Sequence, residues 1–282
     1  MGGGLVVLGL GRLGGEALTH ASDLDLVYLF TGDTAAESDG GRPLGATLYF
    51  NRLAQRVSAA LSVPTAEGAL YEVDTRLRPQ GKQGPLAVSV ASFAKYQREA
   101  AWTWEHMALT RARVIAGSPA AREAIDAILG EVLSAPRDEE SLRADVLAMR
   151  AEITAHKPPQ GPLDAKLLRG GLVDLEFVIH YLQLRSGSAL RPQLGEACRL
   201  LEAAGHLPVP LAEAHDFLGN LLVSVRLFAP DLQMPDAAAA QVLARACGCA
   251  DPQALLRSLQ DARQSVARAW QQVFDETLEI DR

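Results

Sequence analysis

The sequence predicts an α+β protein in which a sheet-and-helix domain (residues 1–117) precedes an all-helical domain (residues 118–282). Short apolar runs of strand length, separated by Gly- and Pro-containing turns, occur in the first third of the chain. After the break at Gly117-Ser118-Pro119 the chain is rich in Ala and Leu and has no alternating segment. At roughly 150 residues per domain, a chain of 282 residues predicts two domains, each able to bury a core.

The first domain is expected to contain four strands. The strands are expected at Leu5–Leu8, Leu24–Phe30, Leu70–Arg78 and Leu86–Val88. The third run alternates in character and is stopped by Pro79. Helical spacing of apolar residues predicts helices over about 13–19 and 48–61, and a further one running from an N-cap at Ser92 through Met107.

The second domain reads as consecutive helices joined by short loops, of which 158–162, with three prolines, is the clearest. The expected helices are Pro119–Leu133, Glu139–His156, Leu172–Arg185, Gln193–Ala204, Leu211–Phe228, Asp236–Ala246 and Pro252–Leu278.

The composition excludes several classes of protein. With 27 Lys and Arg against 34 Asp and Glu, the net charge is −7, so the chain is not expected to bind nucleic acid or an anionic membrane by bulk attraction. Its apolar runs are far shorter than the roughly 20 residues of a membrane span, and the three cysteines have no metal-ligand spacing. No secretory signal is recognised, so a cytoplasmic location is expected.

The segment Gly9-Leu10-Gly11-Arg12-Leu13-Gly14 has the GxGxxG pattern of a dinucleotide-binding turn. A Rossmann-type oxidoreductase is therefore one alternative. Two features oppose this alternative. One is that the chain becomes helical instead of continuing with strand–helix–strand units. In addition, Asp23 and Asp25 open the next strand, where they would repel a pyrophosphate unless a cation lay between.

These carboxylates suggest a metal site. Residues two apart on a strand share a face, so Asp23 and Asp25 point together, as do Glu72, Asp74, Arg76 and Arg78 on the later strand. If the two strands are neighbours, Asp74 completes a cluster of three carboxylates. Divalent metal would relieve their repulsion, and two ions about 4 Å apart can assist an in-line phosphoryl displacement. The backbone N–H groups of Gly9 to Gly15, at the N-terminus of a helix, would hold a triphosphate.

At these residues the sequence resembles the DNA polymerase β-like nucleotidyltransferases, which combine a Gly-rich turn, Asp-x-Asp and a third Asp on a nearby strand. More specifically it resembles the glutamine synthetase adenylyltransferase family. The resemblance rests on four segments besides the Gly-rich turn, and it covers nearly the whole chain. These segments are Ser22-Asp23-Leu24-Asp25-Leu26, Tyr71 through Pro79, Tyr96 through His106 and Gly170 through Phe177.

The resemblance implies transfer of AMP from ATP to a tyrosine of glutamine synthetase, with Mg²⁺ or Mn²⁺. Asp23, Asp25 and Asp74 would be the catalytic metal ligands, and Asp74 either binds the second metal or helps to deprotonate the tyrosine. Partners implied besides the synthetase are a PII-type nitrogen-signal protein and glutamine as an effector. The nucleotide-binding residues expected are Gly14, Gly15, Ser22, Arg76, Arg78 and Lys82. The two arginines could neutralise phosphate charge, and pairing of one of them with Glu72 is the alternative.

Members of this family carry two catalytic halves, and the segments from Tyr71 and Trp102 are similar to the C-terminal, adenylylating half. The chain is thus expected to be an excised piece or the product of a split gene. Phosphorolytic removal of AMP and a non-catalytic regulatory half remain alternatives. The first turn of an expected helix contains Asp174 and Glu176, and this position favours a capping role over catalysis.

Overall fold

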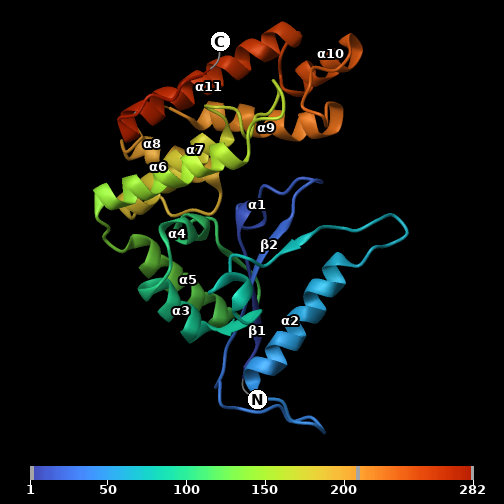
Figure 1. The fold of residues 1–282 in the computed structure, drawn as a ribbon, viewed down its shortest axis with the longest axis vertical. Coiled ribbons are helices and arrows are strands. Elements are labelled where there is room, and N and C mark those ends of the chain that lie inside the picture. Colours follow the sequence, from blue (N-terminus) through green and yellow to red (C-terminus); the bar gives the residue numbers. More distant parts are fainter. Residues whose placement is uncertain (1–2, 208–209, 281–282) are drawn as a thin grey trace. The chain divides into compact units, whose positions relative to one another are not determined.

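The computed structural model describes residues 3–207 and 210–280 and shows an α+β protein (Figure 1). Contacts divide the chain into two compact units, one of Met1–Ala135 with Leu190–Gln193 and one of Pro136–Ala189 with Leu194–Arg282. In the described residues, no helix is both long and apolar enough to cross a membrane.

The first unit is built on a five-stranded mixed sheet. Its strands are β1 (Leu5–Gly9), β2 (Leu24–Phe30), β3 (Val73–Asp74), β4 (Ala87–Ser89) and β5 (Arg113–Ala116). β1 lies between β2 and β5 and is antiparallel to both, whereas β3 and β4 follow one another along the other edge of β2 and are parallel to it. Because β1 and β2 are antiparallel, the turn between them is not the parallel strand–helix–strand unit of a Rossmann domain.

The alternation of β2 places its two sets of side chains on opposite faces of the sheet. Leu24, Leu26, Tyr28 and Phe30 form a core with α2 (Ala46–Ser62), whose Phe50 ring stacks on that of Phe30. Asp23 and Asp25 therefore point to the other face. Helices α3 (Val90–Glu99), α4 (Thr103–Leu109) and α5 (Pro119–Ser134) lie across the sheet from α2 (Figure 1).

Four sequence expectations are wrong in this unit. The helix expected over 13–19 is the single turn α1 (Gly11–Gly14), and the helix expected from Ser92 to Met107 is broken into α3, capped by Ser89, and α4. The long strand Leu70–Arg78 is reduced to β3. The strand β5, which the sequence analysis missed, pairs with β1.

The second unit is helical, as expected. It consists of α6 (Glu139–His156), α7 (Leu172–Ser186), α8 (Leu194–Ala203), α9 (Ala212–Phe228), α10 (Ala237–Ala246) and α11 (Pro252–Phe274). The helix α7 is at its centre, since twelve of its residues are buried, and it packs on α6, α8, α9 and α11. The contacts assign α5 to the first unit, which differs from the division after residue 117 because Ile125 and Leu129 face α3, α4 and β5.

Candidate metal and nucleotide site

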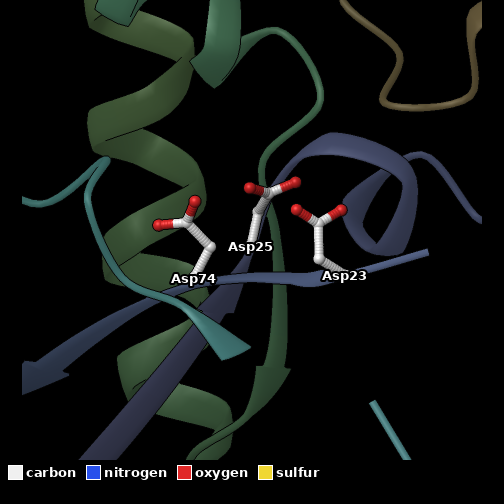
Figure 2. Close-up of side chains that lie close together, drawn as sticks. All are labelled: Asp23, Asp25 and Asp74. Atoms are coloured by element: carbon white, nitrogen blue, oxygen red, sulfur yellow. The ribbon is translucent and has the colours of Figure 1, made fainter. Parts of the chain in front are cut away.

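The register of β2 and β3 brings three carboxylates together. Asp25 pairs directly with Asp74 in the parallel ladder, and Asp23 lies two residues before Asp25 on the same face. One carboxylate oxygen from each of the three residues lies within 4.8 Å of the others. Figure 2 shows Asp25 between Asp74 and Asp23, with all three carboxylates directed to the same side of the strands.

The Gly-rich turn is shaped around this cluster. Gly11 has a left-handed backbone (φ +53°), and a Cβ atom there would clash with Oδ2 of Asp25. The N–H of Leu10 donates to the backbone carbonyl of Asp25 (2.9 Å), which ties the turn to the start of β2. Gly11, which the sequence analysis placed only among the backbone donors of the turn, thus makes room for the central carboxylate.

Gly14 and Gly15 are buried inside the turn. Their N–H groups donate to the carbonyls of Leu10 (2.8 Å) and Gly11 (3.1 Å), so both donors are already engaged. A Cβ on Gly14 would collide with the backbone carbonyl of Arg111 and lie 2.6 Å from that of Gly9. The structure therefore gives Gly14 a close-packing role, and a phosphate contact by these two residues stays a prediction.

Arg113 was also missed in the sequence. It comes from β5, and its guanidinium donates to the carbonyls of Gly14 (3.1 Å) and Leu13 (3.0 Å). It fixes the end of the turn from a position about a hundred residues away, which no local sequence pattern indicates. Ser22, another predicted site residue, is buried, and its Oγ accepts the N–H of Thr19 (3.0 Å).

The predicted arginines have different surroundings. Arg76 lies beyond the end of β3 and binds Asp74, not Glu72: its Nε donates to Asp74 Oδ2 (2.7 Å), and its Nη2 contacts the same oxygen. This hydrogen bond and the charge of Asp74 raise the pKa of Arg76 above its ordinary value, and the charges of Asp23 and Asp25 add to the effect.

Arg78 is buried, and burial lowers the pKa of its guanidinium. It donates to the carbonyls of Thr75 (2.6 Å) and Pro85 (3.1 Å), so it holds the turn after β3 together. The side chain of Lys82 lies outside the described residues. A pocket of about 410 Å³ lies beside the acids, lined by Asp23, Glu72, Val73, Asp74, Thr75, Arg76 and Arg78.

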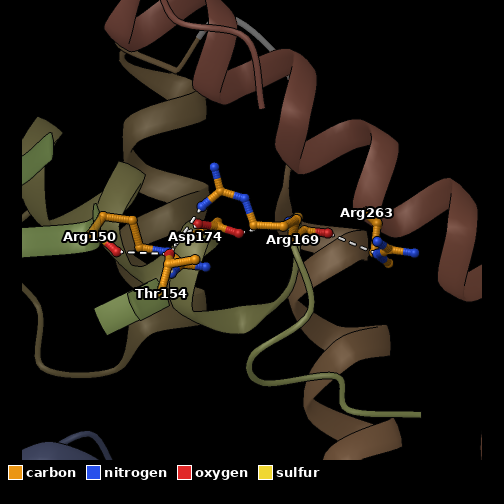
Figure 3. A network of polar contacts seen from close by, with 6 residues as sticks. Arg150, Thr154, Arg169, Asp174 and Arg263 are labelled. Carbon is orange, nitrogen blue, oxygen red and sulfur yellow. Dashed lines mark hydrogen bonds and ion pairs between the residues drawn. The ribbon is translucent and has the colours of Figure 1, made fainter. Parts of the chain in front are cut away.

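A second group of polar residues involves Asp174, which the sequence analysis assigned to capping. Asp174 is fully buried in the first turn of α7; its carboxylate accepts the Arg150 Nε (2.5 Å) and the backbone N–H of Gly170 (2.7 Å). Thr154 accepts from Arg150 and, at 3.3 Å, from Arg169, whose carbonyl accepts Arg263 Nε (2.8 Å; Figure 3). These contacts connect α6, α7 and α11, so the cluster is structural.

The residues of the Trp102–His106 segment also have structural roles within the first unit. Glu105 is buried, and it accepts the Tyr96 hydroxyl (3.0 Å) and the N–H of Trp102 (2.9 Å), which caps α4. His106 Nε2 lies 2.9 Å from the carbonyl of Gln97. These bonds join α3 to α4, while the indoles of Trp102 and Trp104 are exposed.

Comparison with known proteins identifies relatives that match most of the chain. Residues 2–128 match the profile of the family described as Glutamate-ammonia ligase adenylyltransferase. Several proteins named bifunctional glutamine synthetase adenylyltransferase/adenylyl-removing enzyme are similar to the chain. The protein from Agrobacterium fabrum is 53% identical over 184 residues, which are 65% of this chain and 19% of that protein. The Brucella suis protein is 45% identical and covers 80% of the chain and 24% of its own length.

A Bradyrhizobium protein (strain BTAi1) is 41% identical over 283 residues, which are 96% of this chain and 29% of the relative. The chain thus spans about a fifth to three tenths of the length of these curated relatives. On the family profile and on these identities, which together run over nearly all of its residues, the chain belongs to the glutamine synthetase adenylyltransferase family.

Proposed function

We propose that this chain is a polymerase β-like nucleotidyltransferase that transfers AMP from ATP to a tyrosine of glutamine synthetase and releases pyrophosphate. The observation that supports it most is the convergence of Asp23, Asp25 and Asp74 on adjacent strands, beside a pocket large enough for a nucleotide. The names of the relatives supply the substrate.

The donor set fits a hard divalent cation. Mg²⁺ and Mn²⁺ prefer carboxylate oxygens, and three carboxylates this close would repel one another strongly without a cation. Asp23, Asp25 and Asp74 would hold the ion or ions, which when bound lower the charge on the phosphates of ATP and polarise the α-phosphate. The fit rests on the chemistry of these side chains and on their shared face of the sheet.

The protein's own groups would position the reaction around that cluster. The tyrosine hydroxyl of the substrate has an ordinary pKa of about 10, so it is a poor nucleophile until a nearby carboxylate accepts its proton. Asp74, which is partly buried at the edge of β2, is the proposed acceptor or shared ligand. The bond between the α-phosphate and the bridging oxygen breaks as the tyrosine oxygen attacks, and pyrophosphate leaves.

Mass spectrometry of glutamine synthetase after incubation with this chain and Mg·ATP tests the proposal. A mass increase of one AMP on a tyrosine supports it, and no increase with an active synthetase contradicts it. The names of the relatives also include removal of AMP, so phosphorolytic deadenylylation is the second candidate. Incubating AMP-modified synthetase with the chain and phosphate, and measuring ADP, distinguishes the two directions.

The similarity of the segments from Tyr71 and Trp102 to the adenylylating half favours the first direction. Regulation by glutamine and by a PII-type protein, and a cytoplasmic location, are part of the same proposal. The regulation rests on the family resemblance, and the location rests on the sequence expectation given above.

A further inference from the structure

Arg76 occupies both oxygens of one of the three carboxylates. Its backbone N–H donates to Asp74 Oδ1 (2.8 Å), while Nε (2.7 Å) and Nη2 of its guanidinium both donate to Oδ2. A carboxylate oxygen has two lone pairs, so the two guanidinium N–H groups fill the acceptor capacity of Oδ2. Asp74 is thus held by a cation supplied by the chain itself.

This arrangement competes with a bound metal. A Mg²⁺ ligand oxygen lies about 2.0–2.1 Å from the ion, and a guanidinium on the same oxygen would bring two positive groups into contact. Asp74 cannot keep the Arg76 guanidinium on Oδ2 and give that oxygen to a divalent ion at the same time. A divalent ion that takes Oδ2 therefore has to displace the guanidinium.

Arg76 is the group that can move. Its side chain is 68% exposed, whereas that of Asp74 is 15% exposed, so swinging the arginine into solvent breaks few packing contacts. Arg78 offers the opposite case two residues later, because it is buried and fixed by the carbonyls of Thr75 and Pro85. Only Arg76, of these two, is built to change partners.

We propose that Arg76 is a displaceable counter-ion: it holds Asp74 while no divalent cation is bound, leaves Oδ2 when the cation arrives, and then pairs with a phosphate of the nucleotide. The inference rests on the proposed function, because it takes the three carboxylates as the cation site. It makes Arg76 a positioning residue whose two partners, a carboxylate and a phosphate, are exchanged as Mg·ATP enters. A guanidinium suits both, since its planar fork matches either group.

The first experiment follows the Arg76 side chain directly. In protein labelled at arginine Nε, NMR should show an Arg76 Nε–H resonance that shifts when Mg²⁺ is added. Arg98 provides an internal control: its Nε and Nη2 donate to the two oxygens of Glu131 (2.8 and 2.7 Å) in the same unit, so its resonance should not move.

The second experiment measures Mn²⁺ binding by the loss of the free-ion EPR signal. Because an exposed ion pair is weak, Arg76→Gln should tighten Mn²⁺ binding by only about two- to fivefold. The same variant should bind a non-hydrolysable Mg·ATP analogue at least about tenfold more weakly, because a charged phosphate contact is lost. Arg98→Gln, which removes the same charge from a matched pair, should change neither.

Arg76→Lys separates a direct exchange from a general effect of charge. Lysine keeps the charge but not the fork, so direct competition predicts tighter Mn²⁺ binding in this variant as well, whereas a through-space effect predicts the affinity of the unsubstituted protein. The proposal is overturned if Mn²⁺ binding needs Asp25 but the Arg76 resonance stays in place and Arg76→Gln binds Mn²⁺ unchanged. If Asp25→Asn binds Mn²⁺ as well as the unsubstituted protein does, the cation site itself is wrong and both proposals fall.

Discussion

Two groups of acids in this molecule differ in how their charge is balanced. Asp174 is completely buried, and an arginine and a backbone N–H take its two oxygens. Asp23, Asp25 and Asp74 lie together on one face of two adjacent strands, exposed or only partly buried, and Arg76 contacts one of them, Asp74. Burying a charge without a partner costs far more than leaving it in water. The buried acid is thus neutralised within the chain, whereas the more exposed cluster gathers three acids where a cation can arrive.

The largest effect is expected at the cluster of three acids. Asp25→Asn should reduce AMP transfer roughly 1,000-fold because a central cation ligand is lost, while the thermal midpoint without metal stays the same or rises slightly as repulsion is relieved. Single-turnover transfer and calorimetry measure the two. Asp39→Asn, in an exposed loop, is the control and should change neither. Transfer near the unsubstituted rate in Asp25→Asn would remove the distinction between the two groups.

The buried group should respond in the opposite way. Asp174→Asn keeps the shape of the side chain but leaves Arg150 charged and buried, which should lower the free energy of unfolding by about 3–5 kcal/mol. Urea unfolding followed by circular dichroism measures this, with the exposed Asp261→Asn on α11 as a control. If the double variant Arg150→Met/Asp174→Leu recovers most of the loss, the pair is a compensated charge and not a source of net stability.

The Gly-rich turn can be tested in the same way, because Gly14 could contribute either to stability or to ATP binding. Gly14→Ala should lower the free energy of unfolding by about 1–3 kcal/mol, since the added methyl group meets the carbonyls of Arg111 and Gly9. Gly40→Ala, where nothing lies within 4 Å, is the matched control. Weaker ATP binding at unchanged stability would return Gly14 to the phosphate-binding role that the resemblance implies.

The sequence could predict the site wherever a local pattern decides the geometry. Asp23 and Asp25 share a face because β2 alternates, and the apolar residues Leu24, Leu26 and Tyr28 mark the opposite face, which packs on α2. The order of the second-unit helices also follows from their apolar spacing. For both features, the local periodicity of apolar residues indicates the structure that forms.

The rest depends on individual contacts that the pattern of residue types does not reveal, some of them local and some between distant segments. The alternation from Tyr71 to Arg78 predicts a strand, yet the chain turns after Asp74 because Asp74 accepts the N–H of Arg76 and Arg78 holds nearby carbonyls. Likewise, β5 became a strand because it pairs with β1, and Arg113 reaches the turn from there. A tertiary contact of this kind overrides local propensity and leaves no pattern in the neighbouring residues.

The smallest effect is expected at the exposed ion pair of Arg98 and Glu131, in which a guanidinium contacts a carboxylate as in Arg76–Asp74. The guanidinium of Arg98 donates to both carboxylate oxygens of Glu131, and these hydrogen bonds lower the pKa of Glu131 below its ordinary value. A carboxyl whose pKa is lower in the folded state adds stability above its unfolded pKa and loses it as the pH falls through the folded value. Arg98→Gln should thus cause at most a small drop of the thermal midpoint at pH 7, which shrinks in high salt and disappears in acid. Calorimetry from pH 7 down into acid measures this drop of the thermal midpoint. A drop as large as that of Asp174→Asn would mean that exposed pairs contribute as much as buried ones, and the contrast between the two groups of acids would then lose its physical basis.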